Sequence, residues 1–356
     1  MDRRYNSIDI LRALAIIEMI TGHIYMLMTN QNYWIIGFLF VLLFGTWAEA
    51  IFLGCAGTGF FLYINKRIKN DWSKRKIFIE ILKRAAFLFF ITLIILLSFG
   101  FIFDMHISFI IYWSIFQVIA FSMLLFFFIP FFKKIYRRII IITLIFTIYF
   151  GYVIIKYNNI EILFILVSGG AFTYLPWASF YLIGILIGDL ILNTEIEVFK
   201  KILTMPLLSG IILLVLSLFW LNNNTFNIDN LIILHITAYA GYFILFSLIF
   251  FLTDVKEIKS PLQVSLVRWG KVSFSLYYIH FIVIIAGLII APLIISNFTT
   301  KGLQIYQYFI FVAITILIIE IFSRIWEKYD FIFGIEWIMN LISKRSPINK
   351  QINEEG

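Results

Sequence analysis

The sequence predicts an all-α protein that crosses a membrane several times. Hydrophobic residues make up 62% of the 356-residue chain and charged residues only 13%, whereas soluble domains are about half apolar and about a quarter charged. The mean hydropathy is +0.99, and apolar segments long enough to span a bilayer recur along the whole sequence. These observations predict a polytopic bundle of about ten transmembrane helices.

The basic residues predict the orientation of this bundle. The chain carries 28 Lys and Arg residues and a formal net charge of +8. With ten helices, 25 of the 28 fall on one side of the membrane, Arg12 lies within it, and only Lys156 and Lys301 fall on the other side. This asymmetry is the positive-inside pattern. We therefore expect an integral cell-membrane protein with both termini in the cytoplasm, and no nucleic-acid partner.

The apolar segments divide the chain into expected elements. Helices are expected over residues 8–28, 46–65, 85–103, 109–131, 139–155, 176–192, 206–221, 231–252, 273–295 and 305–325. Residues 162–175 are too short to cross the membrane and return, so we expect a re-entrant or interfacial piece there. The basic stretch Lys66–Arg84 is expected to be a cytoplasmic loop. Residues 1–325 form a single transmembrane domain, and 326–356 a cytoplasmic amphipathic segment with a polar tail.

The first apolar segment carries four ionisable residues, which are costly at membrane depth and usually functional there. They are Asp9, Arg12, Glu18 and His23. Arg12 and His23 are eleven residues apart, so they share one helix face about 16 Å apart along the axis, while Glu18 lies off that face. We expect this face to line a polar cavity. An imidazole titrates near neutral pH, so His23 is a candidate general base.

Five stretches of the sequence resemble the membrane acyltransferase superfamily. The pattern of Asp9, Arg12 and His23 resembles the opening of that superfamily, which includes the acyltransferase-3 type. Residues 48–62, 81–90, 175–189 and 269–284 resemble its heparan-alpha-glucosaminide N-acetyltransferase branch and prokaryotic multi-pass relatives. Members move an acyl group, usually acetyl, from cytoplasmic acyl-coenzyme A to a hydroxyl or amine, usually of a sugar. The resemblance therefore implies acetyl-coenzyme A or another acyl-coenzyme A as co-substrate and a glycan or sugar acceptor. From the residue spacing we expect no metal.

One departure from this branch bears on the site. Its central histidine lies in the outer loop after the first helix, but residues 29–47 of this chain contain no histidine, and Gln117 stands where relatives often have one. The resemblance then assigns the chemistry to His23, as in the acyltransferase-3 type, or to His280.

The candidate site residues follow from the motifs that carry the resemblance. His23 and Glu49 are the catalytic candidates, with Glu49 orienting His23 or binding the acceptor. The candidate contacts of coenzyme A are Arg12, His280, Lys83 and Arg84. The candidate supporting residues are Asp9, Trp47 and Trp177.

Plainer interpretations stay open for each of these residues. Arg12 can simply pair with Asp9, His23 and Glu49 can be interfacial polar groups, and His280 can be a core histidine. A secondary transporter or flippase also needs charges at the midplane, and a membrane scaffold without catalysis is a third alternative. The histidines and carboxylates show no metal-ligand spacing. The sequence leaves a homodimer open.

Overall fold

The computed structural model describes residues 5–29, 47–102, 113–158, 174–194, 196–223, 231–257, 260–295 and 298–344. In this part of the chain seven helices are long and apolar enough to span a membrane. They cover Asn6–Met28, Trp47–Lys69, Lys134–Ile155, Tyr174–Asn193, His235–Val255, Ser273–Ile294 and Ile305–Glu327. The predicted class, a polytopic all-α bundle, is confirmed. The predicted re-entrant piece 162–175 and the end of the tail, 345–356, lie outside the described residues.

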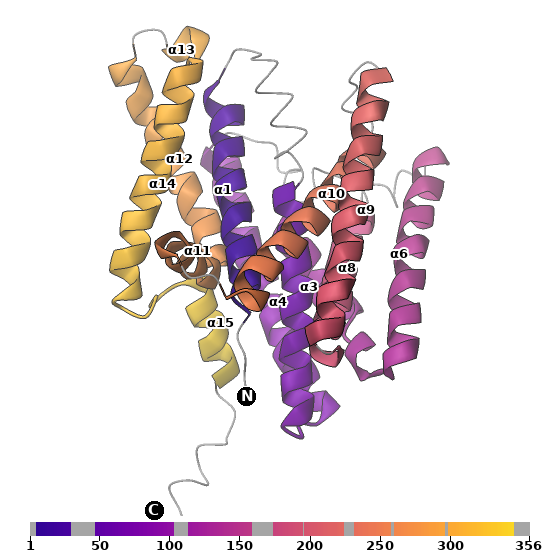
Figure 1. Ribbon diagram of the computed structural model, residues 1–356. Helices are drawn as coiled ribbons and strands as arrows, with labels where there is room; N and C mark the ends of the chain where they lie inside the picture. The colour runs from indigo at the N-terminus through magenta and orange to yellow at the C-terminus, as the bar shows by residue number, and fades with distance from the viewer. Residues whose placement is uncertain are drawn as a thin grey trace, which may run out of the picture. The chain divides into compact units, whose positions relative to one another are not determined.

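The helices fall into two compact units, labelled by element in Figure 1. The first unit contains α1 (Asn6–Met28), α9 (Ile196–Asn223), α10 (Leu231–Phe250), α11 (Pro261–Lys271), α12 (Ser273–Ile294), α13 (Phe298–Lys301) and α14 (Ile305–Glu327). The second contains α4 (Lys74–Ile102), α5 (Ile115–Leu125), α6 (Lys134–Tyr157) and α8 (Tyr174–Asn193). Helix α3 (Trp47–Lys69) begins in the first unit and continues in the second, as does α15 (Ile335–Lys344).

Helix α1 is the central element of the first unit. It packs against α10, α11, α12 and α14, and Figure 1 shows it beside α12 and α14. Asp254 caps its amino terminus, where the backbone N–H groups of Asn6 and Ser7 donate to the carboxylate at 3.2 and 2.9 Å. These N–H groups have no partner within the helix, and the helix dipole favours a negative charge there. At Gly270 of α11, a Cβ would overlap the Asp9 backbone, so glycine is required for the two helices to approach.

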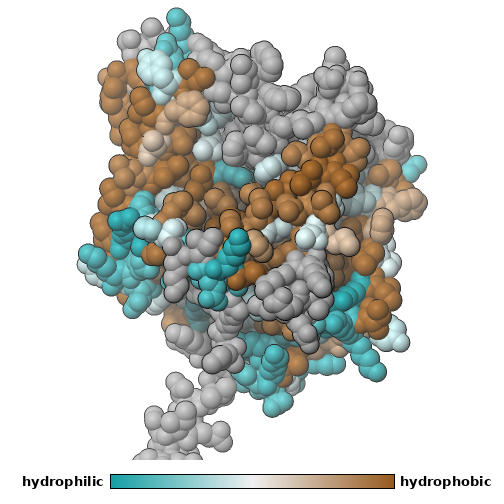
Figure 2. All heavy atoms as spheres, in the orientation of Figure 1, coloured by the Kyte–Doolittle hydropathy of each residue, from teal (hydrophilic) through white to brown (hydrophobic). Residues whose placement is uncertain are grey.

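The outer surface of α12 and α14 is apolar. Ile282, Ile289, Leu293, Phe309 and Leu317 are each more than half exposed. In Figure 2 these helices present a largely brown surface that changes to teal hydrophilic side chains where α14 ends. A helix surface of this kind is stable against lipid and unfavourable against water.

The second unit depends on close contact between the α3 and α8 backbones. The hydroxyl of Thr58 lies 2.9 Å from the carbonyl of Gly54 and 3.0 Å from that of Gly184. A Cβ at Gly57 or Gly184 would overlap backbone atoms of the facing helix. Small residues of this kind let membrane helices approach closely.

The prediction that Lys66–Arg84 forms a loop is wrong. Helix α3 continues to Lys69 and α4 begins at Lys74, which leaves only residues 70–73 between them. The hydropathy pattern marks where the apolar span ends, but Lys and Arg are good helix formers. Basic residues also stabilise the carboxyl end of a helix such as α3. Both helices therefore continue past the apolar segment.

Other predicted boundaries shift for local reasons. The expected helix 109–131 is described as α5 followed by a turn and a 3-10 helix, Ile129–Phe131, because Pro130 cannot continue an α-helix. The predicted inner loop 254–271 contains α11, which begins at Pro261 and is capped by Ser260, whose Oγ lies 3.1 Å from the Gln263 nitrogen. The expected helix 206–221 begins earlier, at Ile196.

Candidate functional site

Two histidines from distant parts of the sequence meet inside the first unit. Nδ1 of His23, on α1, lies 2.9 Å from Nε2 of His280, on α12. The ring centroids are 5.1 Å apart and the ring planes differ by only 19°. Nearly coplanar rings at this separation meet edge to edge through their nitrogens, as a hydrogen bond requires. Phe281 packs against both rings, with centroids 4.5 and 4.3 Å away.

The surroundings of this pair determine which nitrogens carry hydrogen. Nδ1 of His280 lies 3.2 Å from the backbone carbonyl of Leu276. A carbonyl oxygen can only accept, so His280 must carry its hydrogen on Nδ1 when it is neutral. Its Nε2 is then an acceptor, and the hydrogen between the rings must come from Nδ1 of His23. The neutral His23 ring therefore has its lone pair on Nε2.

His280 is fully buried and His23 is partly exposed. The pair thus joins a deep histidine, anchored to its own helix backbone, to a shallower one. Nε2 of His23 can accept a proton, and His280, fixed to its helix backbone, holds the His23 ring in place. This is the arrangement of a general base with an orienting group behind it.

Asp9 and Arg12 form an ion pair within the first turns of α1. The Arg12 guanidinium lies 3.6 Å from Asp9, whose carboxylate is 95% buried, while the Arg12 side chain is 23% exposed. The alternative that Arg12 pairs with Asp9 is therefore confirmed. The pairing also holds the guanidinium in place with part of its surface accessible, which is compatible with binding an anion.

The start of α3 contributes buried polar groups to the same unit. Glu49 is half-buried, with one carboxylate oxygen fully buried, and it interacts electrostatically with Glu18 of α1 and with Tyr277 of α12. One oxygen of Glu18, one oxygen of Glu49 and the indole nitrogen of Trp47 are buried with no hydrogen-bond partner in the described part of the chain. Such atoms are costly to bury unless something binds them. Glu49 thus lies among groups suited to binding a polar acceptor.

The second unit contains a cluster of cations and aromatic rings where α3 ends and α4 begins. The Arg84 guanidinium lies 4.3 Å from the centre of the Tyr63 ring, and the Tyr63 hydroxyl donates to Glu80. Arg67 stacks on Trp72 at 4.2 Å and lies 3.7 Å from Glu80. The predicted residue Arg84 belongs to this cluster, whereas Lys83 is an exposed residue on the neighbouring position of α4. The third predicted residue of this unit, Trp177 on α8, is buried and packs against Phe180.

A model of the family described as heparan-alpha-glucosaminide N-acetyltransferase, catalytic, matches residues 4–215. That span is more than half of the chain. The chain belongs to this family. No curated protein and no solved structure matches the chain.

Membership of this membrane acyltransferase family implies acetyl transfer, with acetyl-coenzyme A as the donor that the family uses. The matched residues include Arg12, His23 and Glu49, but His280 lies beyond them. The structure brings His280 to His23 from outside the matched region. Over the described residues, no group of three His, Cys, Asp or Glu side chains is arranged to hold a metal ion.

Two carboxylates that position the site helices have no signal in the sequence motifs. Glu336, at the start of α15, accepts hydrogen bonds from the backbone N–H groups of Phe274 at 2.5 Å and Ser275 at 3.3 Å, at the start of α12. Burial raises the pKa of Glu336 above its usual range, although these donors oppose the shift. Glu336 does for α12 what Asp254 does for α1. In the sequence, Asp254 closely follows the predicted span 231–252, and Glu336 lies in the predicted amphipathic tail. Neither position shows which helix the carboxylate caps.

Proposed function

We propose that this protein transfers an acyl group, in the first place acetyl, from cytoplasmic acyl-coenzyme A to a hydroxyl or amine of a sugar or another envelope acceptor. Family membership supports acyl transfer in general. The observation that carries the assignment of the base is the hydrogen bond between His23 and His280, because it leaves Nε2 of His23 as a proton acceptor.

In the proposed reaction His23 takes the proton of the acceptor. The acceptor oxygen or nitrogen forms a bond to the acyl carbon, the bond from that carbon to sulfur breaks, and its proton moves to Nε2 of His23. The leaving thiolate then takes this proton from Nε2 of His23, which returns the ring to its neutral form, so charge and atoms balance. His280 stabilises the charged His23 ring by accepting from its Nδ1–H. General-base catalysis of this kind contributes roughly 10²- to 10⁴-fold.

The donor side of the reaction is assigned to cations. Arg12, held by Asp9, is suited to the phosphate or thioester region of the donor, and Arg84 and Lys83 to its negatively charged nucleotide end. This assignment assumes a topology of ten transmembrane helices in one domain over residues 1–325, with both termini in the cytoplasm. The Lys and Arg distribution supports that topology.

Glu49 is proposed as the acceptor-binding group. Its unpartnered oxygen, that of Glu18 and the Trp47 indole nitrogen supply two hydrogen-bond acceptors and one donor in a buried setting. Sugars present both donors and acceptors, so this combination matches a glycan hydroxyl or amine.

The proposal is tested by acyl transfer from radiolabelled acetyl-coenzyme A in proteoliposomes of the purified chain. His23→Ala is expected to lower the transfer rate at least about 100-fold. The matched control is His235→Gln, a change at another buried histidine, on α10, which should leave the rate within a few fold. Equal rates for His23→Ala and wild type would show that another group is the base. Failure of the wild-type protein to bind coenzyme A would favour a transporter.

A further inference from the structure

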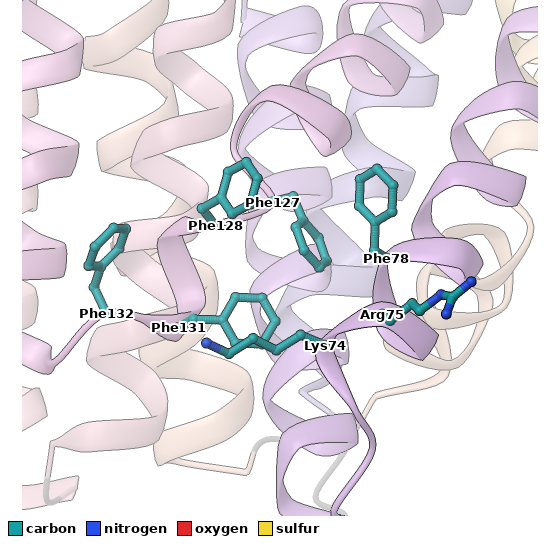
Figure 3. A pocket seen from close by; sticks show the side chains of 7 residues that line it. All are labelled: Lys74, Arg75, Phe78, Phe127, Phe128, Phe131 and Phe132. Carbon is teal, nitrogen blue, oxygen red and sulfur yellow. The ribbon is translucent and has the colours of Figure 1, made fainter.

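A pocket that the proposed reaction does not use lies in the second unit, between the start of α4 and the turn after α5. Its volume is about 420 Å³. Five phenylalanine side chains line it together with Lys74 and Arg75 (Figure 3). The phenylalanines are Phe78 of α4 and Phe127, Phe128, Phe131 and Phe132 of the turn. None of these residues belongs to the site proposed above.

Local structure explains why so many rings gather there. Helix α5 ends at Leu125, and the 3-10 helix Ile129–Phe131 then turns the chain toward α6. In this short turn Phe127 faces Phe78 of α4, and its ring also packs against the rings of Phe128 and Phe131 (Figure 3). Phe127 is almost fully buried and packs edge to face on Phe78, with ring centroids 5.0 Å apart. It forms the floor of the pocket.

The rest of the pocket is open and apolar. Phe128 is 64% exposed, Phe132 45% and Phe78 37%. Full burial of each such side chain is worth about 1.5 to 3 kcal/mol, so leaving a cluster of them in water costs free energy. The rings are therefore suited to contact with hydrocarbon.

The rim of the same pocket is cationic. Lys74 and Arg75 are exposed residues of the first turn of α4, and no ion pair among the described residues uses either of them. Lys74 extends over the Phe131 ring, with its ammonium 5.4 Å from the ring centre (Figure 3). The Lys and Arg distribution predicts that this is the cytoplasmic side, where the positive end of a helix and basic residues attract phosphate.

We infer that this pocket binds an anionic glycerophospholipid of the bilayer. Its phosphate lies at Lys74, whose ammonium is above the Phe131 ring, and an acyl chain lies over the phenylalanine rings; the Arg75 side chain extends the other way and adds positive charge to the rim (Figure 3). Only an amphiphile of this charge matches both halves of the pocket, because a free anion leaves the rings uncovered and a neutral lipid leaves the two cations unpaired. The inference goes beyond acyl transfer and does not depend on it.

The test is native mass spectrometry of the purified full-length chain, titrated in detergent with phosphatidylglycerol or phosphatidylcholine. Wild type should prefer phosphatidylglycerol, and Lys74→Gln/Arg75→Gln should weaken its binding about 10-fold or more. The matched control, Lys69→Gln/Lys328→Gln, removes the same charge from exposed positions outside the pocket and should change binding less than 3-fold. Phe128→Ala/Phe132→Ala should weaken binding of long-chain phosphatidylglycerol but not of its dihexanoyl form.

Three results would overturn the inference. Equal binding of phosphatidylglycerol and phosphatidylcholine would show that the cations do not select the lipid. Equal loss of binding in the pocket and control variants would show that only the net charge of the protein matters. Displacement of bound phosphatidylglycerol by coenzyme A, together with loss of coenzyme A binding in Lys74→Gln/Arg75→Gln, would assign the pocket to the acyl donor instead.

Discussion

Nδ1 of His23 lies 2.9 Å from Nε2 of His280, although 257 residues separate the two in the sequence. The bond joins α1 to α12, and each of these helices is capped at its start by a carboxylate from another element, Asp254 or Glu336. The Leu276 carbonyl, His280 and His23 form one chain of hydrogen bonds, and this chain places the lone pair of the neutral His23 ring on Nε2. The geometry of the proposed base is therefore set by how these two helices are held.

The first prediction concerns the role of His280 behind His23. In His280→Gln the side-chain carbonyl can take the place of Nε2 and accept from His23 Nδ1–H, whereas in His280→Leu nothing can. We expect His280→Leu to lower kcat at least about 10-fold, as loss of an orienting partner does, and His280→Gln to recover most of the rate. The KM for acetyl-coenzyme A should stay constant in both variants.

A spectroscopic measurement separates this role from simple packing. The ¹⁵N shifts of labelled His23 should report hydrogen on Nδ1 in wild type and in His280→Gln, and a mixture of tautomers in His280→Leu. If the tautomer of His23 is the same in all three proteins, His280 does not orient the base.

The second prediction concerns the ion pair of Asp9 and Arg12. Arg12→Gln removes the guanidinium that we propose binds the donor, so it should raise the KM for acetyl-coenzyme A about 10-fold or more. Asp9→Asn should have a smaller effect, because Arg12 keeps its charge but loses its orientation. The double variant should be no worse than Arg12→Gln, because the two residues act as one unit.

Steady-state kinetics measure these constants, and Lys301→Gln is the control. Lys301 is a cation that the sequence assigns to the outer side, so its loss should leave KM unchanged. Additive losses for Asp9 and Arg12 would contradict a shared role.

Composition and charge predicted the helical membrane fold because hydropathy reports directly on which segments leave water. The order of spans along the chain is largely right, from the helix holding Arg12 and His23 to the one holding His280. One group of errors falls where polar and basic residues continue a helix past its apolar segment, as at Lys66–Lys69 and Lys74–Arg84. Hydropathy carries no information about those extensions.

The site was predicted in its parts but not in its connections. The motif pointed to His23 and Arg12 through a shared helix face, and the late motif pointed to His280. Neither implied that the two histidines bond, because that contact depends on the packing of α1 against α12. The capping role of Glu336 was missed for the same reason, since a long-range contact leaves no local pattern.

The third prediction concerns pH and Glu336. Burial raises the pKa of this carboxyl in the folded protein, so the folded state holds its proton to a higher pH than the unfolded chain, where the pKa is about 4.3. The stability that Glu336 contributes is then fully present below that value. It decreases as the pH rises through the folded-state pKa.

Glu336→Gln mimics the protonated form, because its amide offers one acceptor and donors. Its thermal stability in detergent should equal that of wild type near pH 4 and exceed it increasingly as the pH rises. Glu336→Ala is the control, since it removes the cap of α12 at every pH and should cost about 0.5 to 2 kcal/mol. A pH-independent difference between Glu336→Gln and wild type would contradict the raised pKa.

The last prediction concerns the contact between α3 and α8. Gly184→Ala places a methyl group against the backbone of α3 at Gly54, and Gly57→Ala places one against the Tyr181 backbone. Backbone atoms cannot rotate away, so each change should destabilise the second unit by about 1 to 3 kcal/mol. Gly151→Ala on α6 is the matched control, because nothing lies within 4 Å of its added Cβ and alanine is the better helix former.

Cys55 supplies the readout for this comparison. It is the only cysteine in the sequence, it is buried, and it lies on α3 between Gly54 and Gly57. A thiol-reactive fluorophore should therefore label it only when this part of α3 opens. Gly184→Ala and Gly57→Ala should label at lower temperature than wild type, while Gly151→Ala should label at the same temperature or higher. Unchanged labelling in the first two variants would mean that the two backbones are not in contact at Gly54 and Tyr181.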